Sequence, residues 1–178
     1  NNGFIGKFVR YIGKEAHAGG APEKGINALK AATLGLLGID MQRETFMEKD
    51  TIRIHPIITK GGDLVNIVPA DVRVETYIRG ANVPAIMEAA VKVDRSLQAG
   101  ALALGAQVDI DTLPGYLPFR PDNELDDVHG QNLVELLGQE HVKKTDQHST
   151  GSTDMGDIAA IMPSIQPSSG GVRGLFHT

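Results

Sequence analysis

The chain has 178 residues, and its 41% hydrophobic and 22% charged side chains are typical of a globular protein that can bury a core. Its 17 basic and 22 acidic residues give a net charge of −5, which argues against nucleic acid as a partner. Without cysteine there is no disulfide or thiolate metal site, and a cytoplasmic location fits best. No apolar run approaches the roughly 20 residues that span a bilayer, so no membrane partner is expected.

The chain starts with Asn1-Asn2-Gly3 and runs directly into a predicted strand over residues 4–12, which indicates an internal piece of a longer protein. The strand leads into the small-residue loop His17–Gly20. Pro22-Glu23 then predicts the first turn of an amphipathic helix, with apolar residues from Ile26 onward at helical spacing and an end near Gly38.

Two strands and a long helix follow this first unit. Alternating isoleucines predict a strand over 52–59, and Pro56 within it indicates the edge of a sheet. Residues 72–79 alternate apolar and polar side chains, which predicts a strand with one buried and one solvated face. Apolar residues three to four positions apart predict a helix from Val83 to Leu104, and a last half-buried strand covers 108–112.

The order βαββαβ, with helices over one face of a half-polar sheet, predicts a ferredoxin-like α+β domain in residues 1–113. Residues 114–178 differ in texture. They contain a predicted helix over 124–137, a polar stretch and the loop Gly151–Asp157. This second part has too few apolar segments for a core of its own, so we expect it to pack against a neighbour outside the chain.

Three side chains of the first part could carry chemistry, and each has a simpler interpretation. His17 could donate a hydrogen bond to an oxyanion or act as an acid and base, but from spacing alone a solvated loop histidine is the simpler interpretation. Asn66 could be a turn residue of the glycine-containing connection 61–69. Arg79 could hold a carboxylate with its planar fork, or only solvate the sheet edge.

The second part offers weaker signals. Ser152 and Thr153 stand beside Asp154, which is placed to cap a helix, so this helix start could bind an anion or simply be capped. His177 is a weak metal signal by itself, because a zinc site needs three or four ligands. No complete catalytic motif is visible in the sequence.

Three stretches resemble signatures of the dinuclear zinc amidohydrolase and peptidase family, which includes aminoacylases, dipeptidases and glutamate carboxypeptidases. They are the loop and helix start 13–28, the segment 58–79 and the loop 151–157. Within the family, the sequences around 22–27 and 152–157 most resemble the aminobenzoyl-glutamate hydrolases and β-alanyl-lysine-type dipeptidases.

The resemblance implies that residues 1–113 are a lid or dimerisation domain and that 114–178 are the C-terminal portion of an α/β zinc-peptidase catalytic domain. It implies a homodimer formed through the lid. It also implies hydrolysis of a small amide, N-acyl amino acid or dipeptide with two divalent metal ions, zinc or alternatively manganese. The fragment alone is then expected to bind no metal and to be inactive.

The resemblance assigns roles to individual residues as well. His17 would reach the partner's active site and stabilise the tetrahedral oxyanion, and His177 would be a metal ligand. The expected substrate-binding residues are Asn66, Arg79, Ser152 and Thr153. Two rival interpretations remain: a stand-alone dimerisation or ligand-binding module without catalysis, and an amino-acid-binding regulatory domain with the same βαββαβ pattern.

Overall fold

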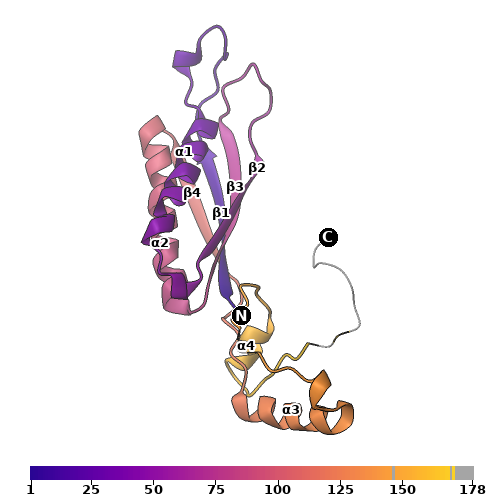
Figure 1. Ribbon diagram of the computed structural model, residues 1–178. Helices are drawn as coiled ribbons and strands as arrows, with labels where there is room; N and C mark the ends of the chain where they lie inside the picture. Colours follow the sequence, from indigo (N-terminus) through magenta and orange to yellow (C-terminus); the bar gives the residue numbers. More distant parts are fainter. Residues whose placement is uncertain (146, 169, 171–178) are drawn as a thin grey trace.

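The computed structural model describes residues 1–145, 147–168 and 170. The first part of the chain is a four-stranded antiparallel sheet with two helices against one face (Figure 1). The strands lie in the order β2-β3-β1-β4. Their bounds are β1 Gly3–Ile12, β2 Arg53–Lys60, β3 Asp71–Gly80 and β4 Gln107–Pro114. The helices are α1 Ala28–Met41 and α2 Val83–Leu104. This arrangement confirms the predicted ferredoxin-like architecture.

The core lies between the sheet and the two helices. Alternate residues of β3 are buried, and the small residues of α1 let it pack closely on α2. A Cβ added to Gly100 would lie 2.6 Å from the backbone nitrogen of Gly35 and would overlap the carbonyl oxygen of Ala31. The hydroxyl of Tyr11 crosses the core and donates to the carbonyl of Leu97 at 2.9 Å. The other face of the sheet carries the polar residues of the alternating pattern.

The predicted start and end of the first helix are wrong. Pro22 and Glu23 form a separate 3-10 turn, η1 Pro22–Lys24. Ile26 is extended and pairs with Lys14 through two backbone hydrogen bonds of 2.9 Å. The helix begins after Asn27, whose side chain accepts from the N–H of Lys30 at 3.0 Å. At the other end Gly38 lies inside α1 against the side chain of Ser96, where its lack of a Cβ permits close packing.

The remaining elements of the first part lie where the periodicity predicts them. β2 is an edge strand, as Pro56 indicates. α2 has the predicted bounds and ends at Gly105, which has a φ of 70°. Two short 3-10 turns, η2 Gln42–Thr45 and η3 Glu48–Asp50, connect α1 to β2.

The second part of the chain contains α3 Asn123–Leu137, the turn η4 Gln139–His141 and the short α4 Met155–Ala159. It joins the sheet at the start of β1 (Figure 1). There the N–H of Phe4 donates to the carbonyl of Tyr116 at 2.9 Å, and the α-amino group of Asn1 donates to that of Phe119 at 3.1 Å. No residue of α3 is buried. Among the described residues, no helix has the length and apolar character needed to cross a membrane.

Candidate functional site

The predicted site residues lie at two opposite ends of the sheet. The loop with His17 leaves the end of β1, and the loop with Asn66 enters β3 at the same edge (Figure 1). Arg79 lies at the other end of β3, where it pairs with Phe4 at the start of β1. Strands of this length span about 30 Å at ~3.3 Å per residue. A single chain therefore does not bring His17 and Arg79 together.

The His17 and Asn66 loops are joined into one unit by their backbones. The N–H of Ala18 donates to the carbonyl of Asn66 at 2.9 Å, and the N–H of Val68 donates to that of Ala16 at 2.9 Å. His17 and Ile67 form a bridge of antiparallel type between these bonds. Both site side chains are exposed. The two loops thus present His17 and Asn66 together at the tip of the domain.

The ring of His17 is oriented by its own loop. The backbone N–H groups of Gly19 and Gly20 donate to His17 Nδ1 at 3.2 and 2.9 Å. A neutral imidazole has one donor and one acceptor nitrogen, so an accepting Nδ1 places the proton on Nε2. Among the described residues, Nε2 has no hydrogen-bond partner. His17 is therefore set up as a neutral donor that points its N–H away from the loop.

A cavity of about 550 Å³ lies between the two loops and the start of α1. It is lined by residues that include Ala18, Asn27, Leu29, Gly62, Leu64 and Val68. His17 and Asn66 are not among the lining residues. The chemistry of these two side chains is thus directed outward from the tip and not into this cavity.

Arg79 is half-buried against aromatic rings at the opposite end of the sheet. Its guanidinium carbon lies 5.8 Å from the centre of the Phe4 ring and 5.9 Å from that of Tyr77. Phe4 in turn packs against Tyr77 with ring centres 4.8 Å apart, and edge-on against Tyr116 at 5.2 Å. Arg79 Nε is buried and has no hydrogen-bond partner among the described residues. Two rings therefore hold a cation whose hydrogen bonds are not all used.

Ser152 and Thr153 lie at the same end as Arg79, because the carbonyl of the preceding Gly151 accepts from the N–H of Asn2 at 2.9 Å. Ser152 Oγ is buried without a partner among the described residues. Thr153 Oγ1 accepts from the N–H of Met155 at 3.3 Å. The prediction that Asp154 caps this helix is wrong, because its side chain makes no capping hydrogen bond and the threonine hydroxyl serves instead. α4 is too short to offer an anion site.

Asn2 forms a buried polar cluster that the sequence did not indicate. Its side chain is fully buried, and its Oδ1 accepts from Thr51 Oγ1 at 2.7 Å and bonds with His148 Nε2 at 2.6 Å. Its Nδ2 donates to the carbonyl of Thr51 at 3.0 Å. The only local signal is at Thr51, a non-glycine residue with a φ of 47°, and that is visible in the structure alone. The cluster fastens the second part of the chain to the sheet.

The described residues hold no metal site of their own. In the parts 1–145, 147–168 and 170, no three His, Cys, Asp or Glu side chains lie close enough together to bind a metal ion. His177, the expected metal ligand, lies outside the described residues. The geometry thus supplies polar groups for orienting a substrate, and no metal-ligand set accompanies them in this part of the chain.

Comparisons with known proteins relate the chain to peptidases. The Xaa-Arg dipeptidase of Mus musculus is 32% identical over 162 residues, which cover 89% of this chain and 37% of that protein. The Xaa-Arg dipeptidase of Homo sapiens is 31% identical over 162 residues, or 89% of this chain and 36% of the relative. A p-aminobenzoyl-glutamate hydrolase homolog of Haemophilus influenzae is 38% identical over 77 residues, covering 42% and 17%. The chain thus spans little more than a third of the two dipeptidases.

Solved structures share the fold. An aminobenzoyl-glutamate utilization protein from Klebsiella pneumoniae superimposes with a TM-score of 0.71 at 21% identity, over 89% of this chain and 40% of that one. An amidase of the hydantoinase/carbamoylase family from Burkholderia vietnamiensis gives a TM-score of 0.74 at 16% identity, over 91% and 38%. Residues 1–99 match the family described as the peptidase dimerisation domain, and this match covers more than half of the 178 residues. The chain belongs to the peptidase dimerisation domain family.

Proposed function

We propose that this chain is part of a metal-dependent amidohydrolase that acts as a homodimer, with residues 1–113 as its lid and 114–178 as part of its catalytic domain. The observation that carries the proposal is the placement of His17 and Asn66 at one end of the sheet and of Arg79, Ser152 and Thr153 at the other. A two-fold dimer can pair unlike ends of two chains, because residue i of one chain then meets residue j of the other and the reverse.

Each active site then takes groups from both chains. His17 and Asn66 of one chain face the partner's Arg79 together with the catalytic part that follows it. The exposure of His17 and its free Nε2–H support this assignment, since a donor that serves another chain has to project from its own. The lone chain is therefore expected to be inactive.

The three lid residues perform distinct tasks. His17 Nε2–H donates to the oxygen that becomes negative as the amide carbonyl is attacked, and this donation is stronger in the transition state than in the ground state. Arg79 binds the substrate carboxylate with hydrogen bonds that the protein leaves unused. Asn66 holds the amide in register with both. These tasks are binding, orientation and charge stabilisation, and the described residues do not fit a metal ion.

The substrate class follows from Arg79 and the relatives. A guanidinium held between rings fits a molecule with a free carboxylate, such as a dipeptide or an N-acyl amino acid. Two proteins similar to this chain are named for dipeptides that end in arginine, and a third for p-aminobenzoyl-glutamate, so all three names specify an amino acid with a free carboxylate. The metal, zinc or alternatively manganese, belongs to the rest of the enzyme. The lack of cysteine supports a cytoplasmic location.

The full-length dimer allows a direct test. We expect His17→Ala to lower kcat by roughly a hundred- to a thousand-fold, the range for losing one oxyanion donor. Lys24→Ala, an exposed change in the neighbouring turn, should leave kcat unchanged and controls for disturbance of the loop. Mixing His17→Ala protomers with protomers that lack a metal ligand should restore activity, because one site of each heterodimer keeps both an intact metal centre and an intact donated His17.

Two results would contradict the proposal. Verified heterodimers without any recovered activity would exclude donation across the dimer. Equal kcat values for His17→Ala and the wild type would remove the catalytic role of His17. A full-length protein that dimerises but hydrolyses no amide with any added divalent metal would favour the rival interpretation, a dimerisation or ligand-binding module.

A further inference from the structure

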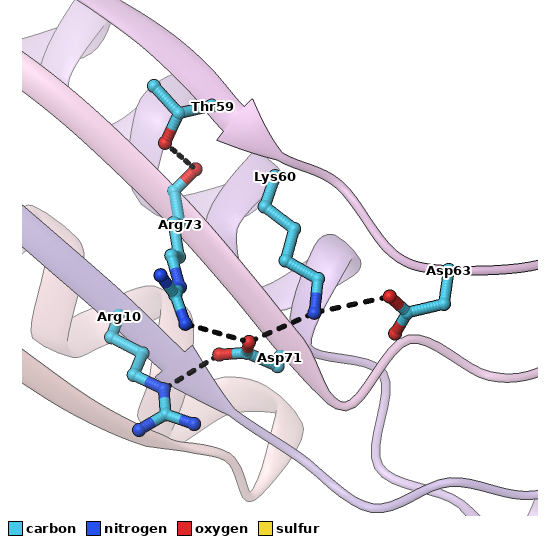
Figure 2. A network of polar contacts seen from close by, with 6 residues as sticks. All are labelled: Arg10, Thr59, Lys60, Asp63, Asp71 and Arg73. Atoms are coloured by element: carbon cyan, nitrogen blue, oxygen red, sulfur yellow. Dashed lines mark hydrogen bonds and ion pairs between the residues drawn. The ribbon is translucent and has the colours of Figure 1, made fainter.

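One carboxylate on the open face of the sheet collects three cations from three neighbouring strands (Figure 2). Asp71 accepts from Arg10 Nε at 2.7 Å, from Lys60 Nζ at 3.1 Å and from Arg73 Nη2 at 3.4 Å. Its side chain is 22% exposed. The hydrogen bond from Arg10 is the main reason that the pKa of Asp71 falls to about 2. Asp71 is therefore ionised at any physiological pH.

The three cations would repel one another without this carboxylate. Arg73 of β3 stands directly opposite Arg10 of β1 and opposite Lys60 of β2. Like charges that face each other across strands are destabilising. Asp63 pairs with Lys60 alone, at 3.2 Å, so among the described residues only Asp71 bonds to all three. The strand ends stay together at this point because Asp71 neutralises the row.

Asp71 also stands at the base of both site loops. It is the first residue of β3, and Lys60 is the last residue of β2, so their ion pair closes the loop 61–70 that carries Asn66. Arg10 lies two positions before the end of β1, from which the His17 loop departs. The tips of the loops are joined by backbone hydrogen bonds, but only side chains of this cluster tie their bases together across the open face.

We propose that Asp71 is a positioning residue that sets where His17 and Asn66 stand, and that it affects catalysis only through them. The catalytic half of this inference rests on the proposed function. The structural half does not, because it concerns the geometry of the two loops. Misplacing a catalytic group by about 1 Å can cost up to ~100-fold in rate. We therefore expect a loss of about 10- to 100-fold in kcat when the Asp71 charge is removed.

The experiment is a double-mutant cycle in the full-length dimer. Asp71→Asn keeps the shape of the side chain and removes its charge. Its matched control is Asp109→Asn, an exposed carboxylate of β4 that stands opposite Arg10 on the same face but does not hydrogen-bond to it. We expect Asp71→Asn to lower kcat in the wild-type background and to change it less than twofold in a His17→Ala, Asn66→Ala background. Asp109→Asn should be near wild type in both.

A second measurement is independent of activity. The amides of Ala18 and Val68 donate across the two loops, so their hydrogen-exchange rates report the integrity of the unit. Asp71→Asn should raise both rates at least tenfold while the exchange of the buried amides of β1 stays unchanged. Asp109→Asn should raise neither. If Asp71→Asn does not fold, Lys60→Gln removes only the tie at the base of the Asn66 loop and should raise the rate at Val68.

Each outcome decides the inference. Unchanged exchange in Asp71→Asn overturns it, and so does a full kcat loss that persists in the His17→Ala, Asn66→Ala background. If His17→Ala itself leaves kcat unchanged, the proposed function fails, and the exchange rates alone then confirm or overturn the role of Asp71 in holding the loops.

Discussion

Asn2 and His148 are 146 positions apart in the chain, yet Asn2 Oδ1 and His148 Nε2 lie 2.6 Å from each other. Because Asn2 Nδ2 donates to the carbonyl of Thr51, its Oδ1 is the acceptor, and His148 Nε2 carries the proton of this bond. The bond joins the start of β1 to the segment that leads to Ser152. The stability of this junction is thus linked to the titration of one imidazole.

This link gives a pH dependence with a definite sign. The pKa of His148 is below its ordinary value of 6.5, first because burial disfavours the imidazolium and second because of the positive α-amino group. The unfolded chain therefore takes up the proton before the folded one as the pH falls. The free energy of unfolding should be level above pH ~7 and should decrease as the pH falls through 6.5 toward the lowered pKa of the folded state.

Urea denaturation between about pH 8 and 5 measures this slope. His148→Gln keeps an N–H donor for Asn2 but does not titrate, so we expect a smaller decrease for this variant over the same interval. The other histidines titrate equally in both proteins and cancel in the comparison. Identical slopes would show that His148 does not carry the dependence.

The ring of His17 should exist as the Nε2–H tautomer when it is neutral, because the amides of Gly19 and Gly20 donate to Nδ1. Long-range proton–nitrogen NMR spectra distinguish a protonated from an unprotonated ring nitrogen. Gly20→Pro removes the donor at 2.9 Å and should produce a mixture of tautomers, whereas Gly20→Ala keeps the N–H and should not. An Nδ1–H signal in the wild-type protein would contradict the donor role.

Gly100 should be the least replaceable glycine of the helix pair. Gly100→Ala places a methyl group against the backbone of Gly35, and overpacking of this kind costs about 1–3 kcal/mol of the free energy of unfolding. Gly130→Ala is the matched control, since it lies inside α3 with no atom within 4 Å of the added Cβ. That change should stabilise by up to about 1 kcal/mol, because alanine favours helices. Equal effects of the two changes in thermal unfolding would refute the close-packing argument.

Lys7 and Asp94 form an ion pair beneath α2 that should be strongly coupled. The Lys7 side chain is 3% exposed, and its Nζ lies 2.9 Å from the carboxylate of Asp94 and 2.7 Å from Thr112 Oγ1. Asp94→Ala leaves the ammonium buried without its counter-ion and should cost about 2–3 kcal/mol, less than the ~3–5 kcal/mol for fully buried pairs because Asp94 is 33% exposed.

The double variant Lys7→Met, Asp94→Leu removes both charges together. It should recover most of the loss seen for Asp94→Ala, since replacing both partners by apolar groups avoids an unpaired buried charge. Chemical denaturation of the single and double variants measures the coupling. Additive losses would show that the two side chains do not depend on each other.

Hydrophobic periodicity predicted β3 and α2 closely, because burial repeats every two residues along the strand and every three to four along the helix. It failed at the first helix, where Pro22 and Glu23 satisfy the local preferences of a helix start but belong to a 3-10 turn. The competing interaction is the pairing of Ile26 with Lys14, which draws the chain into an extended conformation before Asn27.

The site could be predicted only in pieces. The loops of His17 and Asn66 and the strand end at Arg79 were identified from the sequence, but their distribution over the two ends of the sheet depends on strand register. Register is set by pairings between distant segments, which periodicity does not report. The Asp71 cluster and the Asn2 cluster were missed for the same reason, since each draws its members from separate elements.

Both backbone crossings between the two parts of the chain, at Gly3 and at Pro114, lie at the Arg79 end of the sheet. The sheet is therefore a lever with its pivot at that end and His17 at its tip. With an arm of about 30 Å, from ~3.3 Å per strand residue, a rotation of roughly 10° at the crossings displaces the tip by about 5 Å. That displacement is larger than a hydrogen bond is long. Small changes at the Asn2 junction thus suffice to engage or withdraw His17, while Arg79, beside the pivot, hardly moves.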